Sequence, residues 1–249
     1  MKALIFAAGL GTRLRPLTND RPKALVEVAG TTMLERVIRR VAEAGFDDIT
    51  VNIHHFGQQI IDFLKTNNGF GLNIHISDER DLLLDTGGGI LKARRFLEGE
   101  EPFLVHNADI LTDLDLLDFY LSHKHSGALA SLLVKQRVTQ RYFLFDDENR
   151  LQGWVNKKTG ELRPCGLDKD AMPLHERAFG GIHVISPDIF PILERYAAGN
   201  RVFSITPFYV DECKSHHING YEPANDYLWL DVGKPETLAH ANEIFSLTR

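Results

Sequence analysis

The hydrophobic positions of this chain change their period along its length and so separate short strands from amphipathic helices. The apolar run at residues 3–8 is typical of a strand that is buried on both faces of a sheet. In residues 32–44 the apolar positions recur at helical spacing, and Gly45 follows as a stop signal. Further strands are expected at 49–53, 72–76 and 103–106, and further helices at 58–64 and 89–97. This alternation predicts an α/β fold with a doubly wound, mostly parallel mixed sheet flanked by helices.

The second half of the chain is less regular. Strands, some of them antiparallel, are expected at 128–134, 142–145, 151–155 and 179–185, and helices at 187–195 and 239–245. The sequence contains no internal repeat, low-complexity tract or linker-like segment. Residues 1–249 are therefore predicted to form a single domain.

The first predicted strand leads into a loop rich in glycines and cations. Gly9, Gly11 and Thr12 are followed by Arg13, and Lys23 comes shortly afterwards. Glycines let backbone N–H groups approach an anion closely, and the cations neutralise its charge. The loop lacks the Walker pattern, and Leu14 stands where a dinucleotide fingerprint needs its third glycine. A polyphosphate ligand is expected here; alternatively, the two cations are only solvated surface groups.

Composition narrows the classes of function. The net charge of −6 argues against a nucleic-acid-binding surface. Two distant cysteines, Cys165 and Cys213, suit a reducing compartment. No apolar run approaches the roughly 20 residues that span a bilayer, and Met1 leads directly into the first strand, which leaves no room for a signal peptide. We expect a cytoplasmic protein without membrane or nucleic-acid partners. Its oligomeric state is open, a homodimer included.

Two aspartates follow hydrophobic strands, where a sheet presents ligands. Asp109 follows the run at 103–105, and Asp231 follows the run at 227–230. Magnesium binds one or two carboxylates and fills its other positions with water and phosphate oxygens. Asp109 and Asp231 are therefore candidate Mg²⁺ ligands. The alternative is that each of them caps a following helix.

These motifs together resemble the nucleotidyltransferases that make nucleotide sugars from a sugar 1-phosphate. The opening motif of that family stands here as residues 9–18 followed by Pro22-Lys23, and its Trp-x-Asp-x-Gly segment is intact at 229–233. The Asn-Gly-Asp motif of the family is altered in this chain, where residues 107–109 have Ala108 in place of glycine. The resemblance implies a Rossmann-like sheet and a triphosphate cradled at 11–13. It further implies that Arg13 steadies the pyrophosphate, that Lys23 reaches the phosphates, and that Asp109 and Asp231 hold Mg²⁺.

The same resemblance suggests which half binds which substrate. Residues 1–110 would form the nucleotide-binding half, in which Gly87 and Gly88 line the nucleobase pocket. Residues 111–249 would form the sugar-binding half. By position, Asn107 and Gly181 are candidates for the sugar phosphate. Asn156 either contacts the sugar or belongs to a solvated turn within 137–178, the segment that matches the family least.

The segment at 84–90 is most similar to short bacterial uridylyltransferases acting on N-acetylmuramate 1-phosphate. That implies UTP as the nucleotide. The alternatives are a guanylyltransferase for mannose or heptose 1-phosphate and, from another class, a non-catalytic regulatory protein that binds nucleotide sugars. Intact Arg13, Lys23, Asp109 and Asp231 speak against the regulatory protein.

Overall fold

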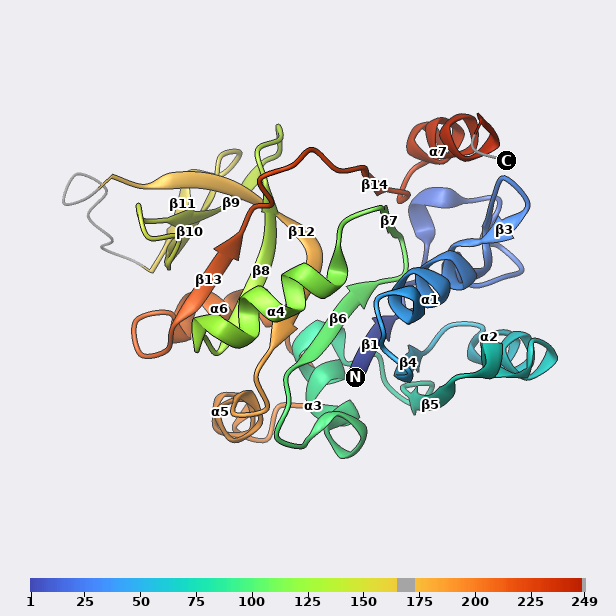
Figure 1. Ribbon diagram of the computed structural model, residues 1–249, viewed down its shortest axis with the longest axis horizontal. Coiled ribbons are helices and arrows are strands. Elements are labelled where there is room, and N and C mark those ends of the chain that lie inside the picture. Colours follow the sequence, from blue (N-terminus) through green and yellow to red (C-terminus); the bar gives the residue numbers. More distant parts are fainter. Residues whose placement is uncertain (165–172, 248–249) are drawn as a thin grey trace.

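A central mixed sheet organises the computed structural model, which describes residues 1–164 and 173–247. Its path through the described residues runs β11-β10-β9-β12-β6-β1-β4-β5, and β8 and β13 attach to it through β12. Four neighbouring strands of this path run parallel to one another: β1 (Lys2–Phe6), β4 (Asp48–Ile53), β5 (Asn73–Asp78) and β6 (Phe103–Asn107). The predicted α/β class and mostly parallel first half are confirmed (Figure 1).

The second half extends this sheet with antiparallel strands. These are β8 (Ala130–Lys135), β9 (Arg141–Phe145), β10 (Leu151–Asn156), β11 (Glu161–Arg163) and β12 (His175–Ile185), and β13 (Ile218–Tyr221) joins β8 in parallel. Two small ribbons complete the strands: β2 (Glu27–Val28) with β3 (Thr31–Thr32), and β7 (Ile110–Thr112) with β14 (Trp229–Asp231). The β7–β14 ribbon joins parts of the chain that are far apart in sequence.

Helices cover both faces of the sheet. They are α1 (Met33–Glu43), α2 (Gly57–Thr66), α3 (Asp85–Leu97), α4 (Leu116–Ser126), α5 (Ile189–Ala197), α6 (Ile205–Glu212) and α7 (Pro235–Leu247). Short 3₁₀ turns lie at Thr12–Leu14, Lys23–Leu25 and Asn68–Gly71. Within the described chain, no helix has the length and apolar character needed to cross a membrane.

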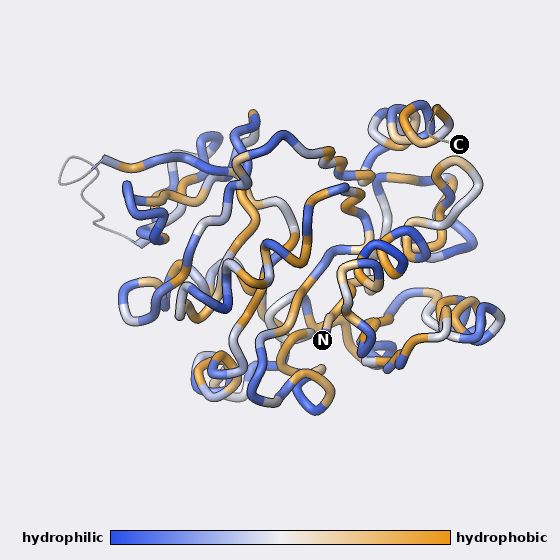
Figure 2. The backbone as a smooth tube through the Cα atoms, viewed as in Figure 1, coloured by the Kyte–Doolittle hydropathy of each residue, from blue (hydrophilic) through white to orange (hydrophobic). Residues whose placement is uncertain are grey.

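Two hydrophobic cores lie on opposite faces of the sheet. Ala3 and Ile5 of β1 pack with α1, α2 and α4 on one face, whereas Leu4 packs with α3, α5 and α6 on the other. This alternation follows from the period of two in a strand. Both faces are covered, so the strand is apolar throughout, as its sequence predicts. Figure 2 shows the hydrophobic residues concentrated along the central strands.

Helix α3 begins earlier than the predicted start at residue 89 and brings its glycines against the segment 201–203. The N–H groups of Gly87 and Gly88 donate to the carbonyl oxygen of Phe203 at 2.9 and 3.1 Å. A Cβ at Gly87 would lie 2.4 Å from the Phe203 ring, and one at Gly88 would lie 2.2 Å from the Arg201 carbonyl oxygen. Close backbone approach therefore explains why these positions carry no side chain.

We expect Gly88→Ala to destabilise the fold by about 1–3 kcal/mol, because its methyl group forces the backbone of residues 201–203 away. Urea denaturation measures this free energy of unfolding. Gly9→Ala is the matched control, because a Cβ at Gly9 meets no described atom within 4 Å. Equal stability of the two variants would contradict the packing described here.

Three histidines are buried and neutral in the folded protein. Burial lowers the pKa of His106 to about 4, that of His123 to about 4 and that of His183 to about 3. In the unfolded chain they titrate near pH 6.5, so the unfolded state binds more protons below that pH. Burial raises the pKa of the Glu79 carboxyl. This single group therefore binds more protons in the folded state and acts in the opposite direction to the histidines.

Stability should therefore fall as pH decreases from 6.5 to 5, by roughly 1–2 kcal/mol for each of these histidines. Urea denaturation at several pH values tests this. The variant His183→Gln should show a shallower slope, and a flat profile for the parent protein would contradict neutral burial of the histidines.

Candidate active site

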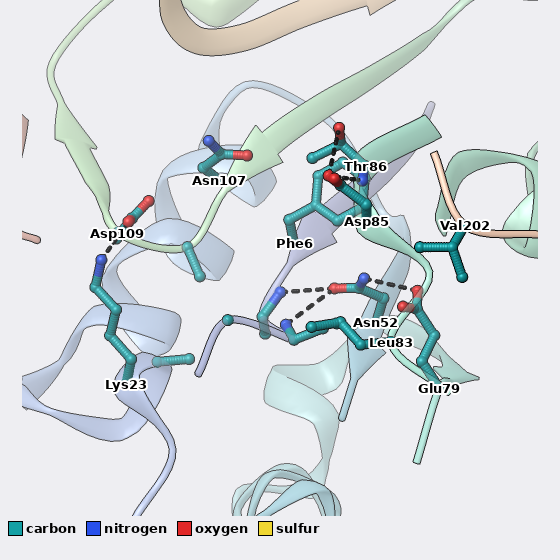
Figure 3. A pocket seen from close by; sticks show the side chains of 15 residues that line it. Phe6, Lys23, Asn52, Glu79, Leu83, Asp85, Thr86, Asn107, Asp109 and Val202 are labelled. Carbon is teal, nitrogen blue, oxygen red and sulfur yellow. Dashed lines mark hydrogen bonds and ion pairs between the residues drawn. The ribbon is translucent and has the colours of Figure 1, made fainter. Parts of the chain in front are cut away.

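A cavity of about 420 Å³ opens at the carboxyl ends of the parallel strands β1, β4 and β6 (Figure 3). Ligands of open α/β sheets bind at this edge. Residues 6–9, at the carboxyl end of β1, form one part of the cavity wall. Residues 107–109, at the carboxyl end of β6, form another. Lys23 and Asp109 stand at one side of the cavity, and Asn52 and Glu79 stand at the other.

A buried hydrogen-bond network fixes the exit of β1. The Asn52 Oδ1 accepts from the N–H groups of Ala7 (2.7 Å) and Ala8 (3.2 Å). The Asn52 Nδ2 donates to Glu79 Oε1 at 2.9 Å, and Glu79 Oε2 accepts from the Leu84 N–H at 3.0 Å. The network joins β1, β4 and the chain that leads into α3, so it sets the width of the cavity.

Sequence reasoning assigned no role to Asn52 or Glu79. Two features of the sequence could have indicated their role. Asn52 is a polar residue within the apolar run 49–53, and Glu79 is a carboxylate shortly after the next predicted strand, 72–76. A buried polar side chain in a central strand needs partners, and the partners of Asn52 are those that shape the pocket.

The loop after β1 is held in place by its glycine. Gly11 has φ 64°, and a Cβ there would lie 2.9 Å from Lys23 Cβ. The Thr18 hydroxyl donates to the Gly11 carbonyl oxygen at 2.8 Å, and Leu14 anchors the turn in the core. Only glycine adopts this left-handed conformation easily and permits this approach. Gly9 lines the cavity, and Thr12 and Arg13 are exposed.

Lys23 forms an ion pair with Asp109. The Lys23 side chain is 11% exposed and that of Asp109 is 26% exposed, so the pair lies at the boundary between the core and the cavity. Ala108, which stands where the family has glycine, does not strain the backbone. Ala108 is not one of the described residues that have a positive φ. Its N–H donates to the Phe6 carbonyl oxygen at 3.0 Å, which ties the Asp109 loop to β1.

The β7–β14 ribbon places Asp231 beside this loop. Asp231 lies opposite Ile110, and the Val232 N–H donates to the Asp109 carbonyl oxygen at 2.8 Å. A Cβ at Gly233 would lie 2.7 Å from Asp231 Oδ1 and 3.0 Å from Arg13 Nη2. The structure thus brings Arg13, Lys23, Asp109 and Asp231 together from four segments of the chain.

The two aspartates suit a divalent cation. Asp231 Oδ1 is buried and has no hydrogen-bond partner in the described part of the chain, which leaves a carboxylate oxygen available to a cation. The described residues contain no cluster of three or more His, Cys, Asp or Glu side chains that could hold a metal. Mg²⁺ needs only one or two carboxylates when phosphate oxygens complete its shell, so the donor set fits Mg²⁺.

The capping alternative does not match the elements that follow the aspartates. Asp109 precedes strand β7. Asp231 ends β14, and the start of α7 is organised by Thr237, whose Oγ1 accepts from the Lys234 N–H at 3.2 Å.

The three candidate sugar-phosphate residues separate in the structure. Asn107 lines the cavity, and a Cβ at Gly181 would lie 2.9 Å from Asn107 Nδ2, so these two are neighbours. Asn156 instead caps the turn between β10 and β11: its Oδ1 accepts from the N–H groups of Lys158 (3.0 Å) and Thr159 (3.4 Å). Asparagine favours such turns because its side chain replaces a backbone acceptor. Asn156 therefore matches the solvated turn, and it does not line this cavity.

The two glycines predicted to line the nucleobase pocket lie behind the cavity wall. Asp85 and Thr86 reach the cavity, whereas Gly87 and Gly88 face the segment 201–203 and contribute by letting Val202 close the wall. Asp85 has φ 58°, an uncommon conformation for a non-glycine residue, and its Oδ1 accepts from the Thr86 N–H at 2.6 Å. Cys165 lies outside the described residues, as does part of the segment 137–178.

Comparison with known proteins gives matches over nearly the whole chain. The model of the Nucleotidyl transferase family matches residues 2–246. The chain is 33% identical over 251 residues to an N-acetylmuramate alpha-1-phosphate uridylyltransferase of Caulobacter vibrioides, covering 94% of this chain and 92% of that protein. It is 32% identical over 235 residues to the protein of the same name from Neisseria meningitidis, covering 94% and 93%.

Solved structures show the same fold. HddC from Yersinia pseudotuberculosis, complexed with GMP-PN, superposes with a TM-score of 0.75 at 22% identity and covers 98% of this chain and 99% of that one. The matching family model, these relatives and the convergence of the opening loop with two strand-end aspartates lead to one conclusion: the chain belongs to the nucleotidyl transferase family.

Proposed function

We propose that this protein transfers a nucleoside monophosphate from a nucleoside triphosphate to a sugar 1-phosphate and releases pyrophosphate. The observation that carries the proposal is the convergence of Arg13 and Lys23 with Asp109 and Asp231 at one edge of the sheet. Two cations suit the charge of a triphosphate, and the two carboxylates suit the ion that accompanies it.

The chain's own groups would bind and orient the reactants. Backbone N–H groups at residues 9–12 face the triphosphate, and Arg13 and Lys23 neutralise the departing pyrophosphate. Asn107 and Gly181 position the sugar phosphate, whose oxygen attacks the α-phosphorus in line. The reaction needs no protein nucleophile, because positioning and charge neutralisation account for most of the catalysis of such transfers. Mg²⁺, when held by Asp109 and Asp231, supplies further charge neutralisation on the phosphates.

We further propose UTP and N-acetylmuramate 1-phosphate as the substrates, and a cytoplasmic location where nucleoside triphosphates are supplied. The support is the name shared by two relatives that match over nearly their whole length. In this arrangement residues 1–110 hold most of the nucleotide, and residues 111–249 hold the sugar. The alternative, a guanylyltransferase for mannose or heptose 1-phosphate, differs in both the base and the sugar, so both substrates have to be varied in the test.

Pyrophosphate release measures the proposed reaction directly. The purified protein is incubated with Mg²⁺ and each sugar 1-phosphate of a panel that includes N-acetylmuramate, mannose and heptose 1-phosphates, and each sugar is combined in turn with UTP, GTP, dTTP or CTP. We expect the highest kcat/KM with UTP and N-acetylmuramate 1-phosphate. Preference for GTP would replace the uridylyl proposal by the guanylyl one. Nucleotide binding in a thermal-shift assay without turnover of any sugar 1-phosphate would favour a regulatory protein instead.

Asp109→Asn should lower kcat on the order of 10²–10³-fold, because an amide replaces the carboxylate that faces the phosphates. The variant should keep its fold, since the side chain is partly exposed and the size is unchanged. Pyrophosphate release measures kcat, and circular dichroism checks the fold. Asp188→Asn, an exposed aspartate at the start of α5, is the matched control and should keep full activity. Near-normal turnover by Asp109→Asn would contradict the metal assignment.

A further inference from the structure

A second cavity, of about 440 Å³, lies between strands β9–β11 and helix α6. Its walls carry the rings of Phe143, Trp154 and Phe179. Phe143 and Trp154 are opposite each other in the β9–β10 pairing, so both rings lie on the same face of the sheet. The Phe143 and Phe179 rings are in edge-to-face contact, with centroids 6.0 Å apart. Flat aromatic walls of this kind suit the C–H faces of a sugar ring.

The same cavity carries excess positive charge. Among the described residues that line it, the charged groups are Arg137, Arg141, Arg163 and Glu161. Arg163 Nε donates to Glu161 Oε1 at 2.7 Å, which neutralises that pair. Arg137 and Arg141 have no acidic partner within the described chain. Two guanidinium groups without an acidic partner among the described residues therefore lie beside the aromatic walls.

Arg137 is held in a fixed orientation with a donor left over. Its guanidinium lies 4.8 Å above the centroid of the Trp229 ring, and its Nη2 donates to the Phe179 carbonyl oxygen at 3.2 Å. Its Nε is buried and has no hydrogen-bond partner in the described structure. A buried donor without an acceptor has given up its hydrogen bonds to water without replacing them, so this group is suited to a ligand that supplies an acceptor.

The second cavity adjoins the first along two walls. Ser204 lines the second cavity, and its Oγ lies 3.5 Å from the Oγ1 of Thr86, which lines the first. On the other wall, Phe179 lies in β12 just before Gly181, the neighbour of Asn107. The Trp229 that stacks on Arg137 belongs to β14, the strand that ends at Asp231. A substrate with its phosphate at the aspartates can therefore extend its sugar past Asn107 into the second cavity.

We propose that Arg137 and Arg141 bind a carboxylate carried by the sugar, so that the enzyme selects an acidic sugar 1-phosphate over its neutral counterpart. This inference rests on the proposed nucleotidyl transfer and names the group that decides its sugar specificity. The planar guanidinium matches a carboxylate in two parallel hydrogen bonds and tolerates partial burial better than an ammonium group. A neutral sugar would leave both arginines unpaired.

The test compares two substrates that differ only in the lactyl ether on O3 of the sugar, the substituent that carries the carboxylate. N-acetylmuramate 1-phosphate carries a lactyl carboxylate, and N-acetylglucosamine 1-phosphate lacks it. With UTP and Mg²⁺, Arg141→Gln and Arg137→Gln should each lower kcat/KM for the acidic substrate about 10- to 100-fold, mainly through KM. For the neutral substrate, kcat/KM should stay within about twofold, and KM for UTP should not change. Arg150→Gln, an exposed arginine at the far end of the same hairpin, is the matched control.

The outcomes separate this inference from the proposed function. Equal use of both sugars by the parent protein, or equal losses for both sugars in the Arg141 variant, would overturn the carboxylate assignment and leave nucleotidyl transfer standing. Failure of the parent protein to release pyrophosphate with any of the four nucleotides and any sugar 1-phosphate, mannose and heptose 1-phosphates included, would overturn nucleotidyl transfer itself. Because Arg141 is exposed, its replacement should leave the fold intact even if Arg137→Gln does not fold.

Discussion

The antiparallel pairing of β7 with β14 is the constraint on which the site depends. It brings Asp231, near the end of the chain, into register with Ile110, so that the Asp109 carbonyl oxygen accepts from the Val232 N–H. Each of the two carboxylates has a cation nearby: Lys23 pairs with Asp109, and Arg13 lies against Gly233 beside Asp231. The ribbon thus creates a carboxylate site whose charge is balanced by Arg13 and Lys23.

A buried hydrogen-bond network holds the floor of the first cavity in place. Asn52 and Glu79 are buried polar groups whose hydrogen bonds are satisfied by one another and by the backbone of Ala7, Ala8 and Leu84. A buried network of this type costs little when every partner is present and much when one is lost. The opposite wall is set by close packing, since the glycines of α3 admit the backbone of residues 201–203.

The two cavities have chemically distinct linings. The first places carboxylates and cations at the edge of a parallel sheet, where charge on phosphates can be balanced. The second lies on the face of an antiparallel extension, where aromatic rings accompany two arginines that have no acidic partner among the described residues. Trp229 connects them: its Nε1 donates to the Gly180 carbonyl oxygen at 2.8 Å, and its ring carries the Arg137 guanidinium.

The sequence by itself determined the α/β class, the parallel first half and the groups that gather around the first loop. Hydrophobic period depends on local backbone geometry, so β1, α1 and β6 were predictable, and a strand end followed by Asp109 indicated the sheet edge where ligands bind. Only the tertiary structure decided which residues meet. The β7–β14 ribbon joins segments more than a hundred residues apart, and Gly87 and Gly88 face another segment instead of the cavity. Such pairings depend on long-range packing, for which a single sequence carries no local signal.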